Sequence, residues 1–108
     1  MARGPDAPIV ANATPWGRGA VAVVRLSGAS LRPLLLQLCR PKGGFPPPRR
    51  ARLTAFFDED GLIDEGLLTF FPGPHSYTGE DVAELGCHGN PLIVERLLRA
   101  AQTAGARL

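Results

Sequence analysis

The sequence predicts an α+β domain in which a mixed, mainly antiparallel sheet carries two helices packed on it. The chain has 108 residues, the size of one domain, and 44% of them are apolar, which is enough for a core. Short β-branched segments predict strands, and longer segments with apolar residues at helical spacing predict helices. The 13 glycines and 11 prolines indicate many tight turns. The expected order of elements is β-β-α-β-β-β-α.

Two strands and a helix are expected in the first part of the chain. Residues 8–11 predict a short strand, and residues 20–26 predict a largely buried strand because they are nearly all apolar and often β-branched. Residues 14–19 form a loop whose two glycines allow unusual backbone angles. Ser30 is expected to cap a helix that runs from Leu31 to about Leu38.

Three more strands are expected in the middle of the chain. Residues 40–48 predict a Pro/Gly-rich surface loop, and residues 51–57 predict the strand that follows it. An Asp60-Gly61 turn makes the next strand, residues 66–71, antiparallel and adjacent. A strand over residues 81–87 follows.

The last element is a helix with signals at both ends. Asn90 is expected to be its N-cap, with Pro91 at the first helical position, and Gly105 its C-terminal cap. The apolar stripe between them consists of Ile93, Val94, Leu97, Leu98 and Ala101. Because Arg107 and Leu108 follow this cap, we expect them to lead into a further strand.

Composition and motifs exclude several classes of function. The sequence has neither a membrane-spanning apolar run nor a secretory signal, so we expect a cytoplasmic protein with Cys39 and Cys87 as reduced thiols. It has no P-loop, so this chain alone should not hydrolyse GTP. The Gly17-Arg18-Gly19 loop precedes a strand instead of opening a helix, which argues against a dinucleotide site. No metal site and no catalytic residue is predicted.

The charges are unevenly distributed. Five basic residues occur without an intervening acid, and five acidic residues then follow without a base. The basic residues are Arg40, Lys42, Arg49, Arg50 and Arg52. They form either a solvated loop or a patch for an anionic partner such as RNA phosphate.

Two charged residues stand out in apolar strands. Arg25 lies near the end of one buried strand, and Glu84 lies in the middle of another, on the same face as Val82. A carboxylate in such a place needs hydrogen-bond donors. One solution is an ion pair between Arg25 and Glu84. The other is a ligand: Glu84 accepts two parallel hydrogen bonds from a guanine or pterin edge, and Arg25 holds a carboxylate or carbonyl.

At these residues the sequence resembles a known family, the N-terminal domain of the MnmE (TrmE) tRNA-modification GTPases. Four blocks carry the resemblance, and the most specific of them reads F-P-G-P-H-S-Y-T-G-E-D. The blocks are residues 9–19, 24–28, 71–81 and 84–89. The resemblance extends over essentially the whole chain apart from its first residues and the Pro-rich loop.

The resemblance implies a fold and a role. The family's domain is similar to the folate-binding domain of aminomethyltransferases, binds a tetrahydrofolate derivative (5-formyl- or methylene-tetrahydrofolate) and forms a homodimer. The complete protein adds a helical domain and a GTPase domain, both absent from residues 1–108. GTP, magnesium and potassium are expected only in that full-length protein. With an MnmG-like FAD protein, it modifies the wobble uridine of tRNA.

The resemblance also implies roles for particular residues. It assigns folate contacts to Arg25 and Glu84, and makes Arg18, Gly19, Tyr77 and His88 candidates for a ligand-facing or interface loop. The family's Q-G-H-G-G pattern reads Gly86-Cys87-His88-Gly89-Asn90 here, which puts the detailed folate affinity in question.

Two alternatives to folate binding stay open. The domain is either an assembly module that dimerises without folate, or an RNA-contacting module that uses Arg49, Arg50 and Arg52.

Overall fold

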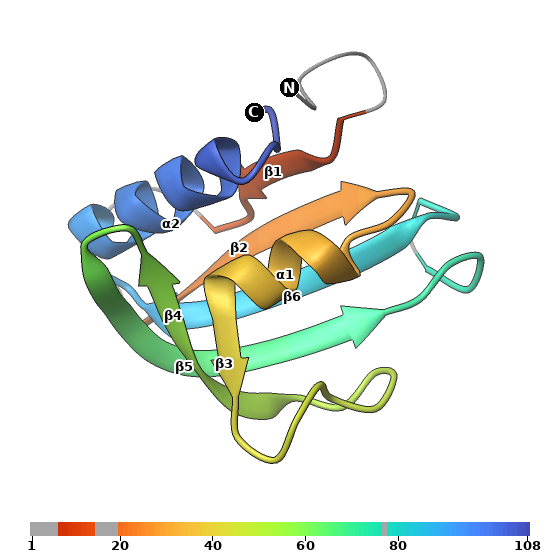
Figure 1. Cartoon of the computed structure of the whole chain (residues 1–108), viewed down its shortest axis with the longest axis horizontal. Helices are drawn as coiled ribbons and strands as arrows, with labels where there is room; N and C mark the ends of the chain where they lie inside the picture. The colour runs from red at the N-terminus through yellow and green to blue at the C-terminus, as the bar shows by residue number, and fades with distance from the viewer. Residues whose placement is uncertain (1–6, 15–19, 77) are drawn as a thin grey trace.

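The computed structural model describes residues 7–14, 20–76 and 78–108. In these residues six strands form one sheet, in the order β1-β2-β6-β5-β4-β3, and two helices lie on one of its faces (Figure 1). The elements are β1 (Ile9–Asn12), β2 (Val21–Gly28), α1 (Arg32–Leu38), β3 (Cys39–Pro41), β4 (Arg52–Asp58), β5 (Gly61–Phe71), β6 (Asp81–His88) and α2 (Pro91–Thr103). Neither helix of this described part is long and apolar enough to span a membrane. The predicted α+β class is confirmed.

All neighbouring strands of the described sheet are antiparallel. The parallel component of the predicted mixed sheet is limited to an isolated bridge between Ile9 and Arg107. There the Val10 N–H donates to the Arg107 carbonyl at 2.8 Å, and the Arg107 N–H donates to the Pro8 carbonyl at 2.8 Å. The residues after α2 therefore pair beside β1.

Alternation along the central strands separates a helix-covered face from an open face. On β2 and β6 the buried side chains Val24, Leu26 and Leu85 face the helices and belong to the core. The open face is the opposite face of the sheet. Its central part consists of Val23, Arg25 and Ser27 on β2 and Val82, Glu84, Gly86 and His88 on β6. Both charged residues singled out by the sequence therefore lie on the open face.

The start of α1 differs from the prediction. The N-cap position is Leu31, with no side-chain cap, so the expected Ser30 cap is wrong. Asp81 of β6 supplies the hydrogen-bond acceptor at the helix start instead. Its Oδ2 accepts from the Leu31 N–H at 3.2 Å, and its Oδ1 accepts from the Gly73 N–H at 3.1 Å. One carboxylate thus satisfies an N–H at the helix start and another in the loop before β6.

Two strand boundaries also differ from the prediction. The expected surface loop over residues 40–48 begins with β3, which pairs with Thr54–Phe56 of β4. Cys39 is buried directly after α1, and the short strand forms the edge of the sheet, where a proline is tolerated. The strand expected over 66–71 begins at Gly61. The turn therefore lies one residue earlier than expected, at Glu59 and Asp60.

The predicted ends of α2 are confirmed. The Asn90 Oδ1 accepts from the Leu92 N–H at 2.8 Å, with proline in the first turn. At the other end Gly105 adopts a φ of 119°, and the Ala106 N–H donates back to the Ala101 carbonyl at 2.9 Å. A positive φ of this kind favours glycine, which explains the residue at this position.

An ion pair fastens α2 to the β4–β5 hairpin. Arg96 donates from Nε to Oδ2 of Asp58 at 2.9 Å and from Nη2 to Oδ1 at 2.7 Å. These hydrogen bonds hold the pKa of Asp58 below its ordinary value of 3.8. A carboxyl group with a lowered pKa stabilises the fold above its unfolded pKa, and this stabilisation is lost as the pH falls.

We therefore expect Asp58→Asn to lower the free energy of unfolding at neutral pH and to have less effect below pH 3.8. Urea unfolding of both proteins at about pH 7 and about pH 2.5 measures this difference. The control is Glu59→Gln, which removes an exposed neighbouring charge. A destabilisation by Asp58→Asn that is equal at both pH values would contradict the assignment.

Gly66 on β5 lies where two strands approach closely. A Cβ at this position would be 1.9 Å from the Gly86 carbonyl oxygen and 3.1 Å from Cε2 of Phe56. At Gly86, a Cβ would meet its nearest neighbour, the Leu67 Cβ, at an ordinary 3.8 Å. The two glycines therefore differ sharply in their tolerance of a side chain.

We expect Gly66→Ala to destabilise the fold by about 1–3 kcal/mol, because the backbone of β6 must move to admit the methyl group. For a domain of this size that is a fall in Tm of roughly 4–8 °C per kcal/mol. Gly86→Ala is the matched control and should change Tm much less. Equal effects of the two substitutions in thermal unfolding would refute this account.

Candidate functional site

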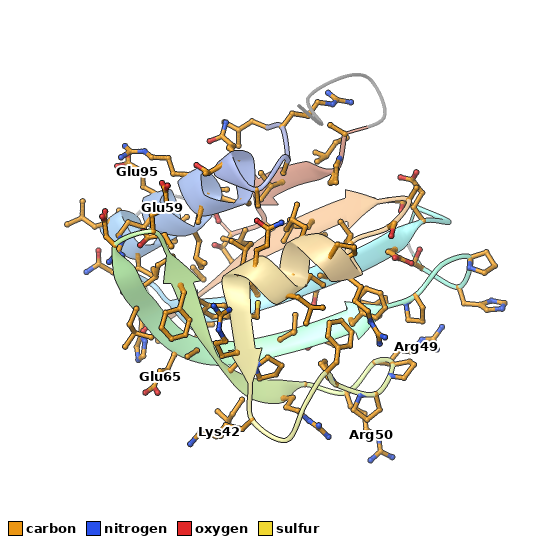
Figure 2. The ribbon with its side chains drawn as sticks, viewed as in Figure 1. Lys42, Arg49, Arg50, Glu59, Glu65 and Glu95 are labelled. Atoms are coloured by element: carbon orange, nitrogen blue, oxygen red, sulfur yellow. The ribbon has the colours of Figure 1, made fainter. Side chains whose placement is uncertain are left out.

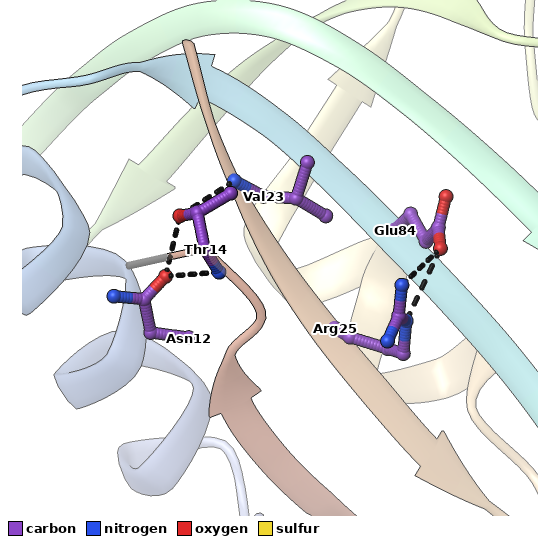
Figure 3. A network of polar contacts seen from close by, with 5 residues as sticks. All are labelled: Asn12, Thr14, Val23, Arg25 and Glu84. Atoms are coloured by element: carbon purple, nitrogen blue, oxygen red, sulfur yellow. Dashed lines mark hydrogen bonds and ion pairs between the residues drawn. The ribbon is translucent and has the colours of Figure 1, made fainter. Parts of the chain in front are cut away.

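Arg25 and Glu84 are directly opposite each other on β2 and β6. Arg25 donates to Glu84 Oε2 from Nε at 3.1 Å and from Nη2 at 2.8 Å (Figure 3). Their side chains are 44% and 25% exposed. Of the two solutions that the sequence leaves open for the out-of-place charges, the structure contains the internal ion pair.

This ion pair is weak enough to be exchanged for a ligand. Exposed pairs contribute about 0–1 kcal/mol, because water screens the charges and holding the side chains costs entropy. Hydrogen bonds that involve a charged group and are shielded by a ligand contribute about 1.5–3 kcal/mol. Both donor groups of Arg25 contact Oε2, and the carboxylate of Glu84 has a second oxygen, Oε1. The ion pair is therefore compatible with the ligand hypothesis.

His88 lies at the end of β6 on the same open face and is oriented by Asp64 of β5. Its backbone N–H donates to Asp64 Oδ2 at 2.8 Å, and its Nδ1 lies 2.9 Å from Oδ1. The imidazole is 70% exposed, whereas the carboxylate is 11% exposed. Because a carboxylate accepts hydrogen bonds, the proton of the contact belongs to Nδ1. Asp64 thereby fixes the ring of a predicted interface residue.

Sequence reasoning missed Asp64, which it counted only among the charges of an acidic segment. Asp64 and His88 are 24 residues apart, and the β5–β6 register brings them together. The available signal was an acidic residue at the start of one strand and a histidine at the end of the strand paired with it.

A polar clamp closes the base of the glycine-rich loop. Asn12 Oδ1 accepts from the Thr14 N–H at 3.0 Å and from the Thr14 hydroxyl at 2.8 Å, and the Val23 N–H donates to Thr14 Oγ1 at 3.4 Å (Figure 3). Val23 is two residues before Arg25 on β2. Thr14, the last described residue before the loop, is therefore bonded to β2 two residues away from Arg25. Arg18 and Gly19 lie outside the described residues, as does Tyr77.

The loop that carries the most specific motif reaches the open face from the other side. Ser27 Oγ of β2 lies 2.9 Å from Thr78 Oγ1. The Thr78 hydroxyl also accepts a hydrogen bond from the Glu80 N–H at 3.2 Å. Ser27 is two residues after Arg25. The described parts of both motif loops are therefore anchored to β2 on either side of Arg25.

Apolar side chains surround these polar groups on the open face. Their positions follow from the register, since each pairs with or alternates into this face. They are Ile9 (43% exposed), Val21 (65%), Leu53 (58%) and Leu67 (45%). Exposed apolar residues gathered on one side of a sheet are typical of an interaction surface.

The departures from the family pattern at positions 87 and 90 do not reach the open face. Cys87 is buried on the helix-covered side, so its bulk lies in the core, on the opposite side of the strand from the His88 ring. Asn90 caps α2. Burial raises the pKa of Cys87 to about 11 and that of Cys39 to about 12, so both free cysteines stay protonated at neutral pH and are poor nucleophiles.

Two hollows of the described surface lie away from Arg25 and Glu84. A groove of about 550 Å³ runs between α1, α2 and the β4–β5 hairpin, and it contains the Asp58–Arg96 pair. A shallower pocket of about 370 Å³ is lined by Arg49, Phe71, His75 and Ser76. The candidate folate residues thus lie on an open surface, which a ligand would need a second surface or the motif loops to cover.

Comparison with known proteins gives a consistent result. The family model described as the GTP-binding protein TrmE N-terminus matches residues 8–108. The chain is 52% identical over 101 residues to the tRNA modification GTPase MnmE of Nitrosospira multiformis, covering 93% of this chain and 22% of the relative. It is 51% identical over 105 residues to the protein of that name from Azoarcus sp. (strain BH72), covering 96% and 23%. The chain spans about a fifth of the length of these curated relatives.

Proposed function

This chain belongs to the TrmE N-terminal domain family, and we propose that it binds a tetrahydrofolate derivative and forms the dimer of a tRNA-modification GTPase. The full-length GTPase that contains this domain acts on the wobble uridine of tRNA in the cytoplasm, together with an MnmG-like FAD protein. GTP, magnesium and potassium bind in other domains of such a protein. The chain itself supplies the one-carbon carrier site and the contact between subunits.

The pairing of Arg25 with Glu84 on the open face carries the folate proposal. A pterin ring presents an N–H edge resembling an amidine, which a carboxylate such as Glu84 accepts through two parallel hydrogen bonds. Arg25, released from the ion pair, then binds a carbonyl or carboxylate of the same ligand. The loops anchored at Thr14 and Thr78 flank this position along β2. A fold similar to the folate-binding domain of aminomethyltransferases is part of the same proposal.

The apolar residues of the open face support the dimer. Val21, Leu67 and their apolar neighbours are exposed in the single chain, and a second copy would bury them. A symmetric contact on this face would also shield Arg25 and Glu84 from water. Such shielding strengthens their hydrogen bonds to a ligand.

Isothermal titration calorimetry with 5-formyltetrahydrofolate tests the site. Glu84→Ala removes the acceptor of two charge-assisted hydrogen bonds, so we expect a loss of about 2–4 kcal/mol, which is roughly a 30-fold or larger rise in Kd. Glu95→Ala removes an equally charged, exposed side chain on α2 and should bind like the wild type.

The ion pair contributes little to stability, so Glu84→Ala should remain folded by circular dichroism. Unchanged binding in this variant would overturn the site assignment. No heat with the wild-type protein would favour the alternative of an assembly module without folate.

Sedimentation velocity tests the dimer separately. The wild type is expected to sediment as a dimer, and Val21→Lys should shift it to the monomer, because it places a charge at the apolar contact. The control, Leu92→Lys, introduces the same charge at a 71% exposed position on α2. A wild-type protein that stays monomeric, or a dimer insensitive to Val21→Lys, would refute the open face as the interface.

A further inference from the structure

A long segment of the chain contains basic residues but no acidic ones. Residues 26–57 contain six arginines and lysines and no aspartate or glutamate. We call these six residues the basic edge: Arg32, Arg40, Lys42, Arg49, Arg50 and Arg52. They come from α1, the edge strand β3, the loop after it and the start of β4. Figure 2 shows Lys42, Arg49 and Arg50 along the lower side of the molecule, Glu59 and Glu95 at the upper left, and Glu65 at the lower left.

The described contacts of the basic edge leave its charge uncompensated. Arg52 Nη1 donates to the carbonyls of Gly43 and Gly44 at 2.8 and 3.2 Å, and Arg49 Nη2 donates to the His75 carbonyl at 2.8 Å. These acceptors are neutral carbonyls, so the guanidinium groups are held in place but keep their full positive charge. A stable arrangement of positive charge is a prerequisite for binding a polyanion.

Aromatic and polar groups adjoin the basic edge. The pocket of about 370 Å³ combines the guanidinium of Arg49 with Phe71, His75 and Ser76. Proteins that bind single-stranded nucleic acid use this combination: cations follow the phosphates, and aromatic rings stack on the bases. The pocket is large enough to hold a nucleobase or a phosphate, though not a long ligand.

We propose that the basic edge binds the phosphate backbone of an RNA strand, with one nucleotide seated in the pocket of Arg49, Phe71 and His75. Five of the six cations are arginines, whose planar fork fits a phosphodiester oxygen pair. The charge argument is independent of the folate site. The choice of RNA over DNA rests on the proposed function in tRNA modification.

A membrane surface fits these residues less well. Peripheral membrane binding combines basic residues with apolar side chains that insert between the lipids. In the loop between Lys42 and Arg49 the exposed residues are glycine and proline, and Phe45 packs edge-on against Phe70 at 5.1 Å between ring centroids. This loop therefore presents charge without an inserting side chain, and the exposed Leu36 of α1 and Leu53 of β4 lie outside it.

Fluorescence anisotropy with a labelled tRNA transcript tests the proposal. The double variant Lys42→Ala/Arg50→Ala removes two exposed charges, and we expect at least a tenfold rise in Kd at about 50 mM salt. The slope of log K against log salt should become shallower by about 1.4–1.8, because each of the two lost phosphate contacts accounts for roughly 0.7–0.9. Arg99→Ala/Arg107→Ala makes the same change in net charge away from the basic edge and should leave both quantities close to the wild type.

A second variant addresses the pocket. His75→Ala should weaken binding to a short single-stranded oligoribonucleotide by several-fold and leave the salt slope within about 0.5 of the wild type, since it removes a stacking surface and leaves every arginine and lysine in place. Equal weakening by the two double variants, or no RNA binding by the wild type at low salt, would overturn the proposal. Tighter binding to phosphatidylserine vesicles than to RNA would assign the basic edge to a membrane instead.

The RNA-binding experiment and the folate-binding experiment can fail independently of each other. A protein that binds 5-formyltetrahydrofolate but no RNA refutes this inference alone, and a protein that binds RNA but no folate refutes the folate site alone.

Discussion

The antiparallel pairing of β2 with β6 sets the geometry of both the helix-covered core and the open face. Eight cross-strand pairs, from Val21–His88 to Gly28–Asp81, join segments almost sixty residues apart. Because side chains alternate along a strand, a slip of β2 by one residue would turn Arg25 into the core and expose Val24 and Leu26. The cost of burying a charge and exposing two apolar side chains therefore selects one register.

The candidate site is a consequence of that register. With β2 and β6 in this alignment, Arg25 faces Glu84, the end of β6 brings His88 to Asp64, and Ser27 reaches the loop at Thr78. Asp81, at the start of β6, connects the same pairing to the first turn of α1 and to the loop at Gly73. One arrangement of two strands thus positions the helix, the motif loop and the charged pair. The basic edge comes from α1, β3, β4 and the loop between these two strands, whereas Arg25 and Glu84 lie on β2 and β6.

The local signals in the sequence predicted much of the fold. The ends of α2 follow from Asn90 and Gly105, whose effects are confined to a few residues. The prediction failed at α1, where the N–H of Leu31 bonds to Asp81, fifty residues away. It also missed β3, because a three-residue edge strand containing a proline has no periodicity of its own and forms only against β4.

The α+β class, the family and the two unusual charges in apolar strands could all be predicted from the amino-acid sequence. These conclusions rest on composition, on hydrophobic periodicity and on motifs, and each of these can be read within a short stretch of sequence. Three features required the folded chain: the contact of Arg25 with Glu84, the orientation of His88 by Asp64, and the burial of Cys87 in the core. These depend on register and face, which no single segment specifies, because they arise from the shared burial of apolar surface by strands and helices far apart in the chain.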